Sequence, residues 1–531
     1  MDQRPVSAAP QKGPPSWRLA PPHDKLAQGM VVSGFASLPT GRALFLKFDW
    51  KGVAKKKAGG AWLQALHAVA PISDADGREE RSAGLGLTWE GMRKMGLHPN
   101  ALASFDRPFK EGMFQEDRLR RLGDRRGEDW QGTVIPGGPK WSGNTPLDDA
   151  AVDDEARAFD DREEIREQRI KTPVTVHALV LLYCEHDEAA EAWCEEVSAA
   201  LAPFEVAVSH HLPLDLRLDK QGIAREHFGF ADGISQPIPF EEGTVVYKDG
   251  TEVPKDYWNG VPLGEILMGH MNGHNEIAQG PVVADGIGDT SGLPEHPKGV
   301  GFKDLGINGS YMVVRELKQD VYAFWQSMRA GAAYIRERDP EGSAHVTTTW
   351  LAERVVGRDT HGNLLCPLGG TIPVENNDFG FWDRDRHGHG CPMGSHVRRA
   401  NPRDGLAPTP ADKQTLLDAA NNHRILRRGR KYGKTISVPP TPDDVDRGLL
   451  FICLNTDITR QFEFVQQTWI LNPNFAFLYD ETDPLIGPKG TMTIPENPLR
   501  RIIDVETFVQ MAGGEYFFLP SMPALDYLGS L

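Results

Sequence analysis

The stretch NGSYMVVRELKQDVYAFW, residues 308–325, changes from a strand pattern to a helix pattern within a few residues. Its first half, SYMVVREL (310–317), is rich in β-branched and aromatic residues, which is typical of a β-strand. The segment after it carries apolar residues at spacings of three, four and seven, which give a helix one buried stripe. The stripe consists of Val321, Phe324, Trp325, Met328 and Ala332. The stretch therefore predicts a strand followed directly by an amphipathic helix.

The same order of elements occurs in both halves of the chain. In the first half, ALFLKFDW (43–50) and VTVHALVLLYC (174–184) have strand patterns, and in the second half GLLFICLNT (448–456) has one. A helical stripe follows residue 184 and another follows residue 456. Their apolar residues are Trp193, Val197 and Leu201, and Phe462, Val465 and Trp469. This repeat predicts an α+β fold of two related domains, each an antiparallel sheet with helices on one face.

A chain of 531 residues is too long for one compact core, so several regions are expected. We predict a flexible Pro-rich arm, an N-terminal domain and a C-terminal domain, with the boundaries 1–28, 29–300 and 301–531. The acidic segment 148–168 is interpreted as a charged surface excursion. Two Gly/Pro-rich regions, 240–305 and 357–410, are expected to be long loops that cover or build a site.

The composition argues against several classes of partner. A formal net charge of −16 repels polyphosphate backbones, so no nucleic-acid partner is expected. The longest apolar runs have only strand length, so no membrane partner is expected either. The first residues lack a hydrophobic segment and a twin-arginine pair, and the five cysteines suit reduced thiols. These features predict a cytoplasmic protein.

The segment HGHGCPMGSHVRRANPR, residues 387–403, places three histidines and one cysteine within ten positions. Structural zinc sites usually use paired C-x-x-C or H-x₃₋₅-H spacings, and the alternating HGHGC run has neither. Its glycines also make an ordered site entropically costly. A zinc loop over residues 387–396 stays an alternative. His396 lies beside arginines, where a histidine is more often structural or anion-binding, unless other residues supply partners.

A candidate acid–base residue lies in FGFADGISQP, residues 228–237. Gly229 and Gly233 bracket Asp232, so the backbone can turn sharply and present the carboxylate at the end of a strand. An Asp-Gly pair alone is a common structural turn. The preceding phenylalanines place Asp232 against hydrophobic neighbours, where a carboxyl group can shuttle protons.

A candidate cation lies in HRILRRGRKYG, residues 423–433. Ile425 and Leu426 are expected to be buried, and Arg427 follows where its side chain can project inward. A buried guanidinium is costly unless it meets an anion or a developing negative charge. A basic surface hairpin is the structural alternative.

Taken together, these segments resemble the dye-decolorizing (DyP-type) haem peroxidases, and most of all their longer bacterial members. The resemblance rests on the G-x-x-D-G turn, the C-P-x-x-x-H-x-R-x-x-N-P-R segment and the H-R-I-L-R-R-G element. It continues in residues 308–325, in LLFICLNTDITRQFEFVQQTW (449–469) and in GGEYFFLPS (513–521). It spans residues 30 to 531 in order.

The resemblance implies duplicated ferredoxin-like domains of the dimeric α+β barrel type, with antiparallel sheets and peripheral helices. It also implies one haem b per chain, held mainly by the C-terminal half. His396 is implied to be the proximal ligand of the haem iron, Asp232 the distal acid and base, and Arg427 the distal cation. Other residues implied at the cofactor are Glu463, bonding the second nitrogen of His396, Leu449 and Phe451, lining the peroxide pocket, and Gly229 and Gly233, shaping the distal turn.

The activity implied by the resemblance is a peroxidase reaction. Hydrogen peroxide would form an oxyferryl compound I, which oxidises dyes, phenols or other bulky aromatic donors in one-electron steps. A haem-binding or iron-handling protein with little turnover is the alternative within the same family. The reducing substrate, a manganese site, a surface relay of Trp or Tyr residues and the oligomeric state are not readable from the sequence.

Overall fold

The structure is a computed structural model that describes residues 17–19, 21–51, 54, 58–76, 80–143, 170–240, 245–247, 257–297, 299–367, 370–373, 377–437 and 439–531. The acidic segment 148–168 lies outside the described residues. Of the predicted arm, residues 1–16 also lie outside them. The rest of the arm contains strand β1 (Trp17–Leu19) and helix α1 (His23–Leu26). The predicted domain boundaries stay a prediction.

Four strands of the N-terminal half form one antiparallel sheet. They are β2 (Thr40–Phe48), β3 (Ser82–Leu87), β8 (Ala178–Cys184) and β9 (Val206–Asp215), in the order β9-β2-β8-β3. Helix α2 (Ala61–Val69) connects the first two strands, and α9 (Asp187–Leu201) connects the last two. Both helices share one hydrophobic core with alternate residues of β2 and β8. This order of strands and helices is that of a ferredoxin-like domain.

The C-terminal half repeats the plan. Its strands are β15 (Ser310–Gln319), β19 (Arg430–Tyr432), β20 (Gly448–Asn455) and β23 (Val509–Leu519), in the order β19-β20-β15-β23. Helix α10 (Val321–Arg338) follows β15. The π-helical segments η6 (Thr459–Glu463) and η7 (Val465–Ile470) follow β20. The duplicated ferredoxin-like fold predicted from the sequence is therefore confirmed.

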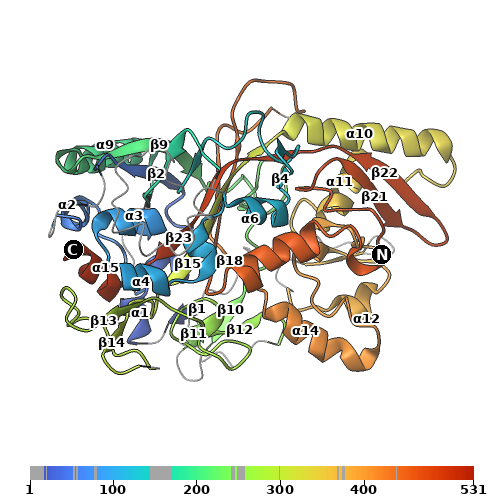
Figure 1. Cartoon of the computed structure of the whole chain (residues 1–531). Helices are drawn as coiled ribbons and strands as arrows, with labels where there is room; N and C mark the ends of the chain where they lie inside the picture. The colour runs from blue at the N-terminus through green and yellow to red at the C-terminus, as the bar shows by residue number, and fades with distance from the viewer. Residues whose placement is uncertain are drawn as a thin grey trace, which may run out of the picture.

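The two sheets join at both edges. Lys431 of β19 pairs with Asp215 of β9, and Phe518 of β23 pairs with Leu87 of β3, so the eight strands close into a barrel. Alternate residues of these strands from both halves form a second hydrophobic core. Because successive side chains of a strand point to opposite faces, this core fills the barrel and the helices cover its outside. Figure 1 shows β2 and β9 with α2 and α9 on the left, and α10 on the right.

The predicted strands and buried stripes agree with the structure. Residues 43–50 and 310–317 lie largely within β2 and β15, and residues 174–184 divide into β7 (Val174–Thr175) and β8. On α10 four of the five predicted stripe residues are buried and Trp325 is partly buried. Among the described residues, no helix is both long and apolar enough to cross a membrane.

Shorter elements surround the barrel. Before β9 they are η1 (Gly29–Val31), α3 (Trp89–Met95), α4 (Pro99–Ser104), α5 (Arg107–Glu111), α6 (Glu116–Arg121), β4 (Arg125–Arg126), β5 (Asp129–Trp130), β6 (Trp141–Ser142) and η2 (Ala202–Phe204). Between β9 and β15 they are β10 (Ile238–Phe240), β11 (Val245–Tyr247), β12 (Gly260–Pro262), η3 (Leu263–Glu265), β13 (Val282–Ala284) and β14 (Phe302–Asp304). After α10 they are α11 (Thr348–Val356), β16 (Leu364–Leu365), β17 (Thr371–Ile372), α12 (Phe381–Asp385), α13 (His396–Ala400), η5 (Pro410–Asp412), α14 (Lys413–Asn421), β18 (Leu426–Arg427), η8 (Phe475–Phe477), β21 (Gly490–Pro495), β22 (Arg500–Val505) and α15 (Met522–Gly529).

Candidate active site

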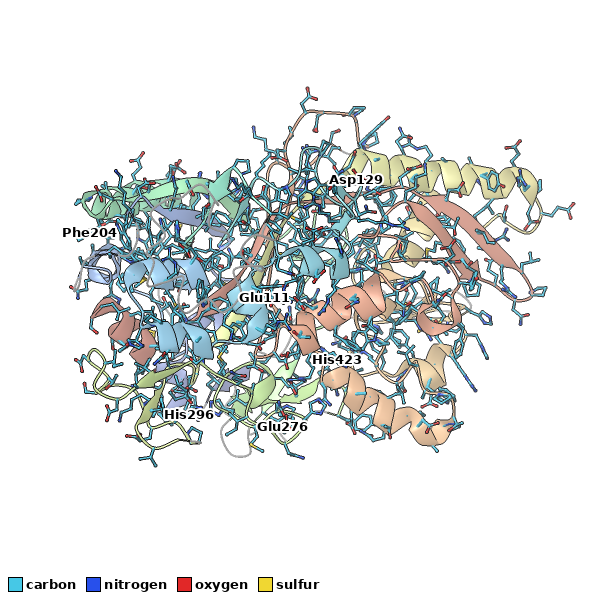
Figure 2. All side chains as sticks on the ribbon, viewed as in Figure 1. Glu111, Asp129, Phe204, Glu276, His296 and His423 are labelled. Carbon is cyan, nitrogen blue, oxygen red and sulfur yellow. The ribbon has the colours of Figure 1, made fainter. Side chains whose placement is uncertain are left out.

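A cavity of about 290 Å³ lies on the outer face of the C-terminal sheet. Its floor consists of Arg315, Leu317 and Gln319 on β15 and Leu449 and Phe451 on β20. Leu450, between the two cavity residues of β20, and Met312 and Val314 on β15 belong to the barrel core, as the alternation of a strand requires. The other walls come from α13, from η7 and from the turn at residues 226–235. His423, which also lines the cavity, lies near the centre of the view in Figure 2.

His396 lines this cavity as the first residue of α13. Its Nδ1 lies 2.9 Å from a carboxylate oxygen of Asp483, which is fully buried. The other oxygen of Asp483 accepts the backbone N–H groups of Leu485 and Ile486. Burial acts to raise the pKa of Asp483, but His396 and these hydrogen bonds outweigh it, so the pKa lies below its ordinary value. An ionised Asp483 therefore keeps the proton on Nδ1 and leaves Nε2 as the nitrogen able to bind a metal.

The prediction that Glu463 bonds the second nitrogen of His396 was wrong. The carboxylate of Glu463 instead meets the guanidinium of Arg118 and accepts the hydroxyl of Tyr516 at 2.7 Å. Phe462, Gln466 and Ile470 line the cavity at intervals of four residues. Glu463 falls outside that row and points to the opposite side of the helical segment, toward α6 and β23.

Asp232 and Arg427 line the same cavity and approach each other. The nearest oxygen and nitrogen of the two side chains are 3.8 Å apart, and both side chains are partly exposed. The turn that carries Asp232 is bound to β18, since Gln236 exchanges two hydrogen bonds with the backbone of Arg427. Arg427 also donates to the carbonyl of Ser235 at 3.1 Å. The predicted acid and the predicted cation are therefore brought together by direct contacts between their two segments.

The glycines of the distal turn differ in their relation to the cavity. Both have positive φ, 99° at Gly229 and 76° at Gly233, which explains why glycine suits these positions. Gly233 lines the cavity and donates its N–H to Asp232 at 2.6 Å. Gly229 lies outside the cavity and shapes the preceding bend. Leu449 and Phe451 line the cavity as predicted.

The other histidines and the cysteine of the 387–403 segment, which only the zinc-loop alternative would use as ligands, do not join His396. The rings of His387 and His389 lie 5.9 Å apart and outside the cavity lining. The buried Sγ of Cys391 contacts the hydroxyl of Ser395 at 3.1 Å. Within the described ranges, no three His, Cys, Asp or Glu residues form a group that could hold a metal ion. Of this segment, only His396 has the geometry of a candidate ligand in the cavity.

The donor set of the cavity fits a haem. Imidazole Nε2 is a suitable axial ligand, and most of the lining is apolar, as a porphyrin requires. Arg358 and Arg403 are buried in the wall, and in the described part of the chain neither forms an ion pair with a carboxylate. Both amide atoms of the cavity residue Asn401 are buried without a hydrogen-bond partner in the same part. Buried cations and amides of this kind suit a ligand with carboxylate groups on an apolar ring.

Sequence reasoning missed several residues of the site, among them Asp483, Arg403 and Glu226. Asp483 lies in ETDPLIG, where an Asp before Pro predicts a turn. The pattern does not show that the carboxylate is bonded to His396. Arg403 belongs to the N-P-R triplet, a pattern that does not show that its guanidinium is buried in the wall of a cavity. Glu226, which binds the distal turn from within, precedes the G-x-x-D-G signature and had no signal of its own.

The sequence of this chain is similar to those of known dye-decolorizing peroxidases. No family model matches the chain. The multifunctional dye peroxidase DyP2 of Amycolatopsis sp. is 32% identical over 326 residues, which cover 57% of this chain and 61% of that protein. This chain spans only 57% to 64% of the length of three of the curated relatives that it matches.

Solved structures match over nearly the whole chain. A DyP-type peroxidase of Anabaena sp. (AnaPX) has a TM-score of 0.67 at 22% identity and covers 95% of this chain and 94% of its own. A dye-decolorizing peroxidase in complex with 2,6-dimethoxyphenol has a TM-score of 0.63 at 22% identity, over 96% and 99% of the two chains. At such identities these structures establish the shared fold.

Proposed function

Because the chain is related to the DyP-type peroxidases in sequence and has their fold, we propose that it is a haem peroxidase. It would use hydrogen peroxide to oxidise dyes, phenols or other bulky aromatic donors in one-electron steps. The proposal rests mainly on one observation. A single cavity is lined both by a histidine with a buried carboxylate partner and by an Asp–Arg pair. The solved complex of a similar enzyme with 2,6-dimethoxyphenol supports phenols as donors.

His396 and the buried arginines would hold the cofactor. When bound, haem would supply a redox centre that gives two electrons to peroxide and regains them from the donor one at a time. His396 would bind the iron through Nε2, while Asp483 accepts a hydrogen bond from the Nδ1–H group and increases the basicity of the ring. Arg358 and Arg403 would bind carboxylate groups of the porphyrin.

Asp232 and Arg427 would act on peroxide. The Asp232 carboxylate can accept a proton from hydrogen peroxide and later donate it to the departing oxygen. Arg427 is always charged, so its guanidinium stabilises the hydroperoxide anion and the negative charge that develops as the O–O bond breaks. The pair needs no large movement, since the two side chains already lie 3.8 Å apart.

Arg427→Leu tests the proposed activity directly. We expect the variant to lower the peroxide-dependent oxidation of 2,6-dimethoxyphenol by about 10²- to 10³-fold, because a preorganised charge is removed from the distal side. The measurement is steady-state oxidation by the haem-loaded protein, with peroxide or haem left out as controls. Oxidation by the unaltered protein that does not depend on peroxide would contradict the proposal. If the protein bound haem but oxidised no donor, the result would favour the alternative of a haem-binding protein with little turnover.

Asp483→Asn tests the assignment of the proximal partner. An asparagine oxygen still accepts a hydrogen bond but carries no charge, so the imidazole becomes a weaker donor to iron. We expect haem affinity or activity to fall by about 10- to 100-fold, and the reduction potential of the bound iron to rise. The measurements are a haem titration and a potentiometric titration. The exposed neighbour Asp480, changed to Asn, is the matched control and should leave both values unchanged. Equal effects of the two substitutions would refute the assignment.

A further inference from the structure

Glu226 lies beneath the turn that carries Asp232. Its two carboxylate oxygens accept the backbone N–H groups of Phe228 at 2.7 Å and Phe230 at 2.8 Å. One of them also accepts the side-chain amide of Gln319 at 3.0 Å. The carboxylate therefore binds the turn from within and connects it to β15. Glu226 and Asp232 both line the main cavity and a smaller cavity of about 20 Å³ next to it.

Gln319 can serve both protonation states of this carboxyl group. Its amide N–H₂ donates to the ionised form. Its Oε1 is buried and, within the described residues, has no hydrogen-bond partner. A protonated Glu226 has an O–H to donate, and rotation of the Gln319 amide brings that acceptor to it. A neutral Glu226 is therefore stabilised here, because the Oε1 of Gln319 can accept its O–H.

The electrostatic setting favours a proton on Glu226. Burial raises the pKa of its carboxyl group to about 7, against the opposing effect of the hydrogen bonds from the turn and from Gln319. The charge of Asp232 adds to the rise. Glu226 therefore changes charge within the neutral range.

The other charged groups that face Glu226 have partners of their own. Arg225, on its own turn, pairs with Asp219 at 2.5 Å, and Lys431 on β19 pairs with Asp215 on β9 at 3.4 Å. Arg315, on β15, pairs with Asp124 at 2.5 Å. Of the other charged groups at these cavities, Arg217 pairs with Asp187, Arg430 donates to backbone carbonyls, and Arg427 lies beside Asp232. Arg358, Arg403, Arg424, His396 and His423 line the main cavity but not the smaller one. Asp124 lines only the main cavity and Asp215 only the smaller one, whereas Asp232 shares both cavities with Glu226.

We propose that Glu226 is a positioning residue for Asp232 and that, with Gln319, it holds a second proton next to the distal acid. The inference rests on the proposed peroxidase function. Below about pH 7 Glu226 is neutral and leaves the distal side free of extra negative charge. Above that pH its carboxylate repels both Asp232 and an incoming hydroperoxide anion. The protonation state of Glu226 therefore sets how fast the distal side accepts peroxide.

The first test is the rate of the peroxide reaction, followed by stopped-flow absorption of the haem-loaded protein from pH 6 to pH 8. We expect the rate constant to fall by roughly three- to tenfold over this range. Glu226→Gln cannot ionise and should remove the fall, whereas Glu226→Asp keeps an ionisable group and should retain it. Asp219→Asn removes the partner of Arg225, which donates to the carbonyl of Gly229 in this turn, and Asp219 lies outside both cavity linings. It is the matched control, with the fall retained. A fall that persists in Glu226→Gln, or that is absent from the unaltered protein, overturns the inference.

The second test is thermal stability and does not depend on peroxide or donor. The folded pKa of about 7 lies above the ordinary value of 4.5, so the folded state holds this proton more firmly than the unfolded state. The resulting stabilisation is complete below pH 4.5 and is lost as the pH rises to 7. We expect the Tm of the unaltered protein to drop by about 3 °C more than that of Glu226→Gln over this range. Equal drops in Tm for the unaltered protein and Glu226→Gln overturn the inference about Glu226. If the protein does not react with peroxide at any pH, only the proposed function is overturned.

Discussion

Replacing His396 with alanine is expected to abolish stable haem binding. His396 is the histidine of the 387–403 segment that lines the cavity, and Asp483 holds its ring so that Nε2 is the available nitrogen. Loss of the axial ligand should weaken haem affinity by more than about 100-fold, since loss of a supporting carboxylate alone costs 10- to 100-fold. The measurement is a titration of the cofactor-free protein with haem, followed by its Soret absorption.

The matched control comes from the same segment. His387 is exposed and lies outside the cavity lining, so His387→Ala should bind haem as the unaltered protein does. If His387→Ala lost haem to the same extent, the glycine-rich loop itself would be the metal site, as the zinc-loop alternative holds. If His396→Ala retained an unchanged Soret band, the axial ligand would be another residue.

Replacing Asp232 with asparagine is expected to slow the reaction with peroxide by about 10²- to 10⁴-fold. That is the usual contribution of a positioned acid–base group, and an amide cannot accept the proton that peroxide must lose. The substitution preserves shape, and the hydrogen bond from the N–H of Gly233 can still be accepted by the amide oxygen. The measurement is the second-order rate constant for peroxide in stopped-flow experiments.

Haem binding serves as the internal control for Asp232→Asn. The Soret band of the resting variant should match that of the unaltered protein, because Asp232 interacts with Gly233 and Arg427, whereas His396 is held by Asp483. A variant with normal haem and an unchanged rate constant would show that another group moves the proton, and Glu226 would then be the first candidate.

The fold was predictable because its signals are local and repeated. The 308–325 stretch shows a strand and a helix by composition and spacing alone, and the strand at 174–184 is followed by the same helical stripe. Closure into a barrel was not visible in these patterns. It depends on the pairing of Lys431 with Asp215 and of Phe518 with Leu87, residues far apart in the chain.

The site was predictable only where a residue carried its own motif. Asp232, His396 and Arg427 stand in recognisable segments, and all three line one cavity. The partner of His396 was misassigned, because Glu463 and Asp483 are both acidic residues that follow β20. The choice between them depends on which side of the η6–η7 segment faces the cavity. The π-helical geometry of that segment cannot be inferred from the 3.6-residue pattern assumed for an ordinary helix.

The most direct test of the central claim is the absorption spectrum of the haem-loaded protein before and after one equivalent of hydrogen peroxide. We predict a strong Soret band that drops and broadens on peroxide, and that returns to its starting form when 2,6-dimethoxyphenol is added. A protein that acquires no Soret band, or whose band does not respond to peroxide, would contradict the account.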